Sequence, residues 1–408
     1  MRVAAVLYDR GAVSGVAERE GADRGRLRPV LAYAFLAAAT QLLWLTFAPL
    51  TTASAHHYRT SETAIGWLAE IFPLLYLVLA LPAGRLLDRS LHRWLGFGAA
   101  LTALGGVARV IGPHYGWALL GQVLVATGQP FVLNAVTKVA AEHLPPERRP
   151  HGIAVGSAGI FAGMLLALVL GTVFGGAHLE ALLVVQAAFA VLAAIATIAT
   201  LLRGARAGTD EPAVAVDPVA LRAVWADRGV RVLAGLLFIG FGAFIALCTW
   251  LQALLHNYHV SSMTAGTLLV AMVLAGAVGA AALPPIVVNR RAERRVVGAS
   301  VVVTAVGGLL LAFEHAVVVD AIALVPIGLL LLTDLPVILE LSERRAGASA
   351  GTVTALLWLA GNAGGVLVAL LVQLLVHHPT PAFLLLAVFA LCAAPLVVAL
   401  APQEAAPD

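Results

Sequence analysis

Twelve long apolar segments, separated by short polar loops, are the feature that most restricts the fold of this chain. A helix that crosses a membrane needs about 20 mostly apolar residues. Only 12% of the residues are charged, against roughly 25% in a typical soluble domain. No segment alternates apolar and polar residues as the strands of a membrane β-barrel do. We therefore predict an all-α membrane protein with twelve transmembrane helices. The predicted spans cover residues 29–51, 63–84, 94–112, 117–140, 151–176, 180–203, 230–255, 262–285, 296–313, 316–340, 349–376 and 382–401.

Similar sequence elements recur about half a chain apart. TGQPFVLNAV (127–136) resembles TDLPVILELS (333–342), and LPAGRLLDR (81–89) resembles LPPIVVNRR (283–291). Weak self-similarity of this kind is typical of membrane proteins built from two related bundles. We therefore predict two pseudo-symmetric six-helix bundles. The expected parts are a cytoplasmic N-terminal tail (1–28), a first bundle (29–203), a cytoplasmic linker (204–229), a second bundle (230–401) and a cytoplasmic C-terminal tail (402–408).

The basic residues indicate the orientation in the membrane. If the N-terminal tail is cytoplasmic, 22 of the 25 Lys and Arg residues fall in the tail or in loops on that side, and the opposite loops contain only Arg59. Basic residues gather in cytoplasmic loops. We expect both termini to be cytoplasmic and the protein to lie in the plasma (inner) membrane. Lys138 is the only lysine, a bias that favours a bacterial source with a GC-rich genome.

The loop between the second and third predicted spans, GRLLDRSLHRW, combines a glycine, an acid and several bases. Gly84, Asp88, Arg89 and Arg93 match a signature of the major facilitator superfamily, which this six-plus-six chain resembles. Leu91 stands where that family usually has a second glycine. The resemblance implies a major facilitator fold in which these four residues form a cytoplasmic gate, with the acid reaching a helix N-terminus or an arginine of the other half. The alternative is that the bases only fix the topology.

Within that superfamily, several short motifs resemble the feline leukaemia virus subgroup C receptor family. They are QLLWLTFAPLTTASA in the first span, AIGWLAEIF in the second and GQPFVLNAVTKVA in the fourth. Members of that family are associated with choline, ethanolamine, pyridoxine and haem transport. The resemblance implies that Trp44 offers an indole face to a quaternary ammonium group and that Gln129 binds a hydroxyl or a headgroup. Trp250 lies near the aromatic position of the family's seventh span, and Trp358 replaces a polar residue of the eleventh, where it forms a second aromatic wall or faces lipid.

Four of the ionisable residues inside predicted spans are candidate functional groups, because a charge in the membrane is costly enough to suggest a function. Glu70 is either a proton-carrying group or the ion-pair partner of Arg109, which lies near the same end of its helix. Asp334 occupies nearly the same repeat position as Gln129, so we expect it at a substrate site between the halves. Lys138 is close enough to the cytoplasmic surface to reach it and anchor its helix.

Three functions are consistent with the sequence. The first is a carrier that moves a small organic solute, such as the cation choline, by alternating access. The second is a proton-coupled exporter of a metabolite or drug in which Glu70 and Asp334 titrate, and the third is a non-transporting membrane sensor. No nucleotide-binding, nucleophile or metal-ligand motif is present in the sequence, so we expect no enzyme activity, no cofactor and no metal. We expect a monomer in the bilayer that has a small-molecule substrate, exchanges protons in the second case, and does not bind nucleic acid.

Overall fold

The computed structural model describes residues 27–145, 148–204, 224–314, 316–346 and 350–400, and these are helical with no strand among them. The first helix covers residues 27–44 and is followed by the 3-10 turn η1 (Ala48–Leu50). The other elements are α2 (Thr51–Tyr58), α3 (Glu62–Arg89), α4 (Leu91–Ala108), α5 (Tyr115–Leu133), α6 (Val136–His143), α7 (Arg149–Phe174), η3 (Gly176–His178), α8 (Leu179–Gly204), α10 (Arg228–His256), α11 (Ser262–Asn289), α12 (Glu293–Phe313), α13 (Val317–Ala346), α14 (Ala350–Gln373), α15 (Pro379–Leu391) and α16 (Ala394–Ala399).

Eleven candidate spans are long and apolar enough to cross a membrane within the described ranges. The remaining predicted span corresponds to α4, an 18-residue helix that packs between α5 and α8. The predicted all-α membrane fold is confirmed. The expected tails and linker fall mainly on residues 1–26, 205–223 and 401–408, which lie outside the described residues, so the domain boundaries stay predictions.

Three predicted spans are interrupted, each for a local reason. The first span breaks shortly before Pro49, and the last breaks between α15 and α16 shortly before Pro395. Proline disfavours helical conformation in the preceding residue and lacks a backbone donor. The fourth span breaks at Asn134, whose side chain bonds α3 by accepting from the hydroxyl of Tyr76 (2.9 Å) and donating to the carbonyl of Ala80 (2.9 Å).

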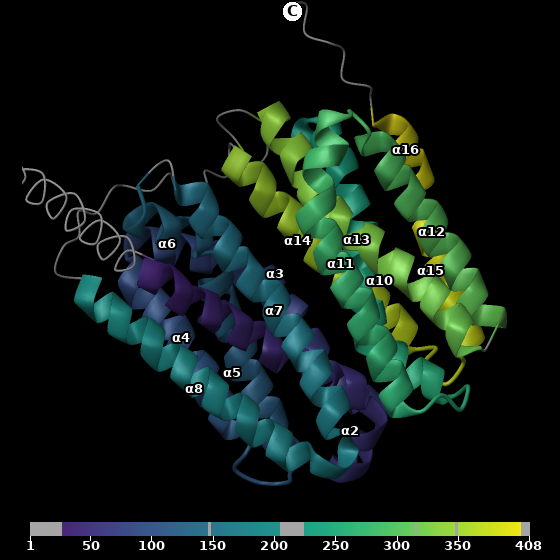
Figure 1. The fold of residues 1–408 in the computed structure, drawn as a ribbon, viewed down its shortest axis with the longest axis horizontal. Coiled ribbons are helices and arrows are strands. Elements are labelled where there is room, and N and C mark those ends of the chain that lie inside the picture. Colours follow the sequence, from purple (N-terminus) through teal and green to yellow (C-terminus); the bar gives the residue numbers. More distant parts are fainter. Residues whose placement is uncertain (1–26, 146–147, 205–223, 315, 347–349, 401–408) are drawn as a thin grey trace, which may run out of the picture.

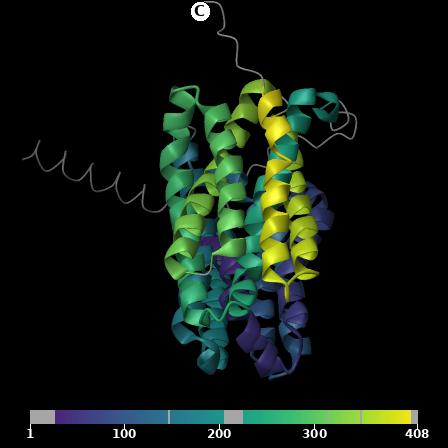
Figure 2. The same cartoon turned by 90° about the vertical axis from the view of Figure 1, so that its right-hand side faces the viewer.

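The helices form two groups that follow the order of the sequence (Figure 1). In the first half α4 packs on α5 and α8, and α3 packs on α5; in the second half α11 packs on α13, α10 on α14, and α12 on α15. Contacts between the halves join α3 to α14 and α7 to α11. Figure 2 shows the second half in front, with α12, α15 and α16 on the side turned away from the first half.

Equivalent helices of the two halves pack through glycine in the same way. A Cβ at Gly163 of α7 would collide with the backbone of Ala38 in the first helix, and one at Gly364 of α14 would collide with the backbone of Phe238 in α10. Glycine permits such close approach of helix backbones in membranes. The fifth span therefore meets the first as the eleventh meets the seventh, which agrees with the internal repeat.

Two ends of the molecule are distinguished below. The α2 end contains α2, η3 and the turn between α10 and α11, and the α6 end contains α6, the turn between α3 and α4, and α16 (Figure 1).

Candidate functional site

A hydrogen bond joins the two halves in the interior of the protein. Thr249 of α10 donates its hydroxyl to Oε1 of Glu70 in α3 at 3.0 Å. Both side chains are buried, and Oε2 of Glu70 has no hydrogen-bond partner. An unpaired carboxylate oxygen in an apolar setting is unfavourable, so this carboxyl group is a candidate functional group at the interface.

One helical turn from Glu70 along α3, the indole ring of Trp250 packs against Gly66. Trp250 of α10 is fully buried, and a Cβ at Gly66 of α3 would collide with its ring atoms. Gly66 and Glu70 are four residues apart on a helix and so face the same way. The Nε1 atom of Trp250 also has no hydrogen-bond partner. α3 and α10 therefore meet in direct contact over this turn.

A third contact closes the interface nearer the α2 end. The backbone N–H of Thr52 donates to Oε1 of Gln252 at 3.1 Å, and Nε2 of Gln252 donates to the hydroxyl of Thr52 at 3.3 Å. The same hydroxyl donates to Oε1 of Glu62 at 2.6 Å. We refer to Thr52, Gly66, Glu70, Thr249, Trp250 and Gln252 as the α2-end closure.

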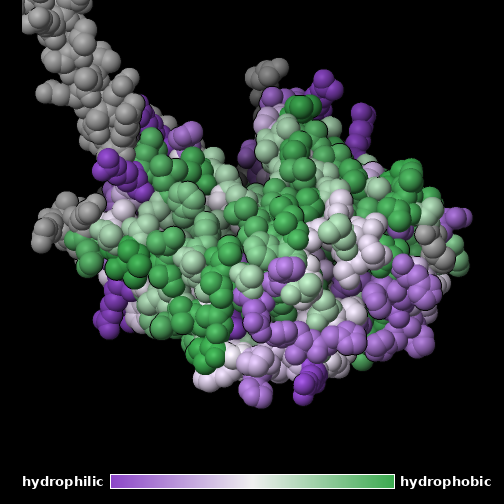
Figure 3. Space-filling view, turned by 60° about the horizontal axis from the view of Figure 1, so that its bottom comes forward, coloured by the Kyte–Doolittle hydropathy of each residue, from purple (hydrophilic) through white to green (hydrophobic). Residues whose placement is uncertain are grey.

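The hydrogen bonds identified between the halves gather at one end of the molecule. Every recorded hydrogen bond between the halves, among the residues described, belongs to the α2-end closure. A Cβ built on Gly84, near the α6 end of α3, would meet no atom within 4 Å. Figure 3 shows a polar face at the α2 end and, on the opposite side, a notch between the two lobes. This conformation is sealed at the α2 end and parted at the α6 end.

Trp44 lies beside the closure, with its indole N–H already engaged. Its Nε1 donates to the carbonyl of Ala69 at 3.0 Å, and its ring centre lies 6.3 Å from that of Phe72. Because Ala69 precedes Glu70, this bond places the indole next to the turn that carries the carboxyl group. The side chain is 7% exposed, so in this conformation the ring is packed rather than open.

Trp358 and Gln129 lie away from the closure. Trp358 of α14 is half-buried and meets Phe241 of α10 edge to face at 5.8 Å. Gln129 of α5 is buried, and no hydrogen bond of its amide to another described residue is recorded. Trp44 and Trp250 thus both contact the stretch of α3 that carries Glu70, whereas Trp358 contacts the half of α10 nearer the α6 end.

Of the two alternatives for Glu70, the ion pair with Arg109 is wrong. Arg109 donates to the hydroxyl of Thr46 at 2.8 Å, to Oε1 of Gln186 at 3.1 Å and to the carbonyl of Leu43 at 3.4 Å. These partners belong to the first span and α8, whereas Glu70 faces α10. Arg109 therefore joins helices within the first half, and Glu70 has no cationic partner in the described structure.

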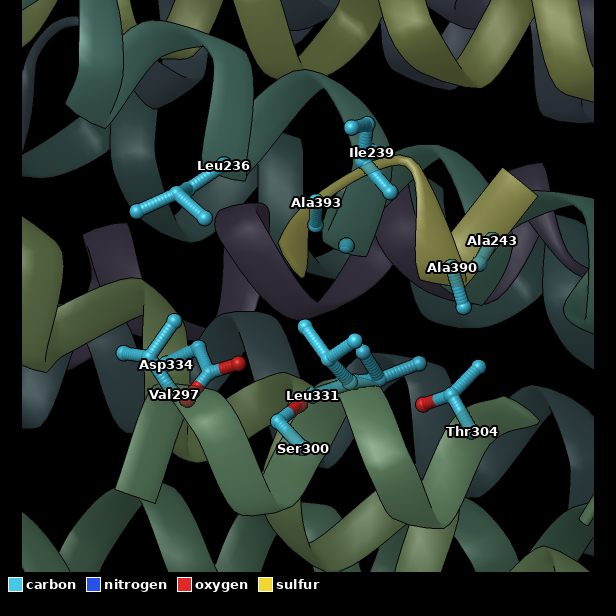
Figure 4. A pocket seen from close by; sticks show the side chains of 12 residues that line it. Leu236, Ile239, Ala243, Val297, Ser300, Thr304, Leu331, Asp334, Ala390 and Ala393 are labelled. Atoms are coloured by element: carbon cyan, nitrogen blue, oxygen red, sulfur yellow. The ribbon is translucent and has the colours of Figure 1, made fainter. Parts of the chain in front are cut away.

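Asp334 lines a small cavity formed by residues of the second half (Figure 4). The cavity lies between α10, α12, α13 and the end of α15, and its other polar side chains are Ser300 and Thr304. Asp334 is 7% exposed and its Oδ1 has no hydrogen-bond partner. The structure does not bring Asp334 together with Gln129 or with the α2-end closure.

An ion pair and a histidine–carboxylate contact join helices at the α6 end of the first half. Asp88 of α3 pairs with Lys138 of α6, and His92 of α4 lies 3.1 Å from the carboxylate of Glu142. The guanidinium of Arg93 lies 5.6 Å from the ring centre of Trp94. Lys138, expected as a surface anchor, is thus the partner of the signature acid. Asp88 pairs within its own half in this conformation.

Thr249, Gln252 and Thr52 were not expected from the sequence. Small polar residues inside apolar helices usually bond their own helix backbone, and no spacing marks those that reach a neighbour. Gly66 had a signal, because it falls in the AIGWL motif four residues before Glu70.

Comparison with known proteins gives a family match and a set of relatives. A family model described as Major Facilitator Superfamily matches residues 30–369. Solute carrier family 49 member A3 of Danio rerio is 28% identical over 365 residues, which cover 83% of this chain and 77% of the relative. The choline/ethanolamine transporter FLVCR2 of Homo sapiens is 27% identical over 123 residues, which cover 29% of this chain and 23% of the relative.

Two solved structures share the fold. A bacterial homolog to the human lysosomal transporter Spinster, in an inward-facing and unoccupied conformation, has a TM-score of 0.67 at 14% identity and covers 91% of this chain and 96% of that chain. The nucleoside transporter NupG, as a point mutant, has a TM-score of 0.69 at 12% identity and covers 91% of this chain and 98% of that chain.

Proposed function

Because this chain belongs to the Major Facilitator Superfamily, we propose that it carries a small organic cation such as choline across the plasma membrane by alternating access. The chain is a multi-pass membrane protein of a solute-transporter family. The observation that carries the proposal is the α2-end closure, in which Thr249 and Trp250 of one half seal against Glu70 and Gly66 of the other. A carrier that seals one end while its halves part at the other has the geometry that alternating access requires.

Two observations support a cationic solute. The first is the local match to a choline/ethanolamine transporter, a protein whose named solutes are cations. The match covers only 23% of that relative. The closure combines the indole ring of Trp250 with the carboxyl group of Glu70, and the indole of Trp44 lies beside it. An aromatic face attracts a desolvated cation by about 2 kcal/mol or more, and a carboxylate adds a counter-charge.

We assign the solute path to Trp44, Gln129, Trp250 and Trp358, and propose that the solute meets them at successive depths. The rings of Trp358 and Phe241 lie on the α6 side of the closure, where an entering solute meets aromatic surface first. Trp44 and Glu70 follow at the sealed turn. In this proposal Gln129 supplies a neutral hydrogen bond to the hydroxyl of the solute.

The orientation follows the basic residues. We propose that the α6 end faces the cytoplasm, because the arginine-rich loops and the expected termini are at that end. The sealed α2 end then faces outward, and Gly84, Asp88, Arg89 and Arg93 form the cytoplasmic gate. With arginine at all but one of the basic positions, we favour a bacterial inner membrane.

The proposal is tested by uptake of labelled choline into proteoliposomes, with and without an imposed pH gradient. Saturable uptake that decreases in Trp44→Ala and in Gln129→Ala, with folded protein retained, supports the function and its site. Uptake equal to that of empty liposomes removes choline as the solute. Wild-type rates in both variants would remove the site assignment while keeping the function.

A second candidate is a proton-coupled exporter of a metabolite or drug. The observation that favours it is the unpartnered Oε2 of Glu70 at the half-to-half interface, because a buried carboxyl group avoids an uncompensated charge by holding a proton. In that case Glu70→Gln abolishes transport driven by a pH gradient and leaves solute exchange intact. Transport that ignores the gradient in wild type would exclude the exporter.

A further inference from the structure

The cavity around Asp334 is separate from the path between the halves. Its lining comes from four positions of α10, four of α12, two of α13 and the end of α15, all in the second half. In Figure 4 the carboxyl group of Asp334 and the hydroxyl groups of Ser300 and Thr304 lie around the same space, facing the apolar side chains of α10 and α15. Ser300 and Asp334 line the same cavity.

Two oxygens that line this cavity lack partners. Oδ1 of Asp334 and the hydroxyl of Thr304 are buried without a hydrogen bond, and the two residues are 7% and 3% exposed. Ser300 and Thr304 are four residues apart on α12, so both face the same side. Buried polar groups are almost always satisfied, so a species that is not protein is expected between these oxygens.

The size and the charge of the cavity restrict that species. Its volume is about 20 Å³, and a space of roughly 10–15 Å³ holds a single water, so an organic solute is excluded. Its lining contains one carboxyl group and no basic side chain. An ionised carboxylate here requires one compensating positive charge. A divalent ion would leave one positive charge uncompensated in the cavity.

We propose that Asp334, Ser300 and Thr304 bind one sodium ion in this cavity. Carboxylate and hydroxyl oxygens are suitable ligands for a hard cation, and the donor set contains no nitrogen or sulfur that would favour a transition metal. Ser300 lies seven residues into α12, roughly 10 Å from its start, so the ion sits within the membrane-embedded part of the second half. α10 lines the cavity at Leu236, Ile239, Gly240 and Ala243 and carries Thr249 and Trp250 further along. Ion binding therefore acts on the helix that seals the α2 end.

The test is a thermal-unfolding series on the purified full chain in detergent, in chloride salts of sodium, potassium and N-methylglucamine at equal ionic strength. A ligand that binds only the folded state raises Tm with its concentration. We expect Tm to rise by at least about 2 °C in sodium over potassium and the rise to disappear in Asp334→Asn. Glu70→Gln, which neutralises a buried carboxyl group in the other half, is the matched control and keeps the shift.

Binding of radioactive sodium at equilibrium provides a second readout that needs no transport activity. One ion per chain is expected in wild type, with weaker binding in Thr304→Val and in Ser300→Ala, so the site can be tested even if Asp334→Asn fails to fold. Three results would overturn the proposal. They are no sodium-specific shift in wild type, a shift that persists in Asp334→Asn, and a Tm that depends on pH through Asp334 but not on sodium. The last result would assign the cavity to a proton, and the first would leave it to water.

Discussion

The indole ring of Trp250 lies directly over the backbone of Gly66, and no side chain larger than hydrogen fits between them. This contact brings α10 of the second half against α3 of the first at the turn that carries Glu70. The interface is therefore sealed by shape at Gly66 and by a hydrogen bond at Glu70, two features that can be altered separately.

Replacing Gly66 by alanine should prevent the α2 end from closing. The added methyl group collides with the rigid ring of Trp250, and overpacking of this kind costs about 1–3 kcal/mol. We predict a decrease in transport of about tenfold or more, with folded protein retained, measured as solute uptake per folded protein. Gly96→Ala is the control, because a Cβ there meets no atom within 4 Å. Equal losses in the two variants would show that the effect is not due to the Trp250 contact.

Replacing Thr249 by valine removes the hydroxyl and keeps the shape of the side chain. Both oxygens of Glu70 are then buried without a partner, which costs about 1–3 kcal/mol and is borne only by the sealed conformation. We predict that the population sealed at the α2 end falls, measured as faster labelling of a cysteine introduced at Thr52. Thr267→Val, whose hydroxyl donates to its own helix at Met263, should leave the labelling rate unchanged. A rate in Thr249→Val equal to that of wild type would remove the bond from the closure.

Arg109 and Glu70 should act independently. Arg109 makes three hydrogen bonds within the first half, and bonds to a charged group contribute about 1.5–3 kcal/mol each. We predict that Arg109→Gln lowers the free energy of unfolding by about 3 kcal/mol or more, whereas exposed Arg89→Gln changes it little. Combining Arg109→Gln with Glu70→Gln should give additive effects. If the double variant were more stable than the sum of the two single effects predicts, this result would indicate that Arg109 and Glu70 do form an ion pair.

Variants of the Asp88–Lys138 pair can distinguish a role in local stability from a role in gating. Both side chains are partly exposed, so Lys138→Gln should reduce stability by no more than about 1 kcal/mol. We predict that the reversed pair, Asp88→Lys with Lys138→Asp, recovers the stability of wild type but not its transport rate, because we propose that Asp88 exchanges its partner when the cytoplasmic gate closes. Recovery of full transport in the reversed pair would limit Asp88 to its local contact.

The depth of a residue along its helix could be predicted from the sequence, but the rotation of the helix about its own axis could not. The positions of Glu70 and Arg109 near one end of adjacent helices follow from counting residues, and the helices themselves follow from apolar length. The direction in which each side chain points depends on how the helices pack. These helices are apolar on most faces, and an apolar face can contact either lipid or a neighbouring helix, so the sequence does not show which face is buried. For this reason the sequence suggested an ion pair between residues that face different partners.

The break at Asn134 shows the same limit. The apolar segment continues past Asn134, so one span is predicted over 117–140. The side-chain amide of Asn134 instead forms hydrogen bonds with Tyr76 and Ala80 of α3. Likewise, Asp334 was expected between the halves because its repeat position resembles that of Gln129. In the structure it lines a cavity together with residues of α12, a neighbour that only the packing of the second half determines.

The most direct test of alternating access is a reversible lock on the α2-end closure. In a background with Cys248→Ala and Cys392→Ala, cysteines are introduced by Thr52→Cys and Gln252→Cys, two positions that touch across the halves. They are joined by a short cleavable thiol-reactive cross-linker, and choline uptake into proteoliposomes is measured before joining, after joining and after cleavage. The account predicts uptake that stops on cross-linking and returns on cleavage, whereas the cross-linker leaves the uptake of each single-cysteine variant unchanged. Uptake that continues at the same rate in the cross-linked protein would contradict it.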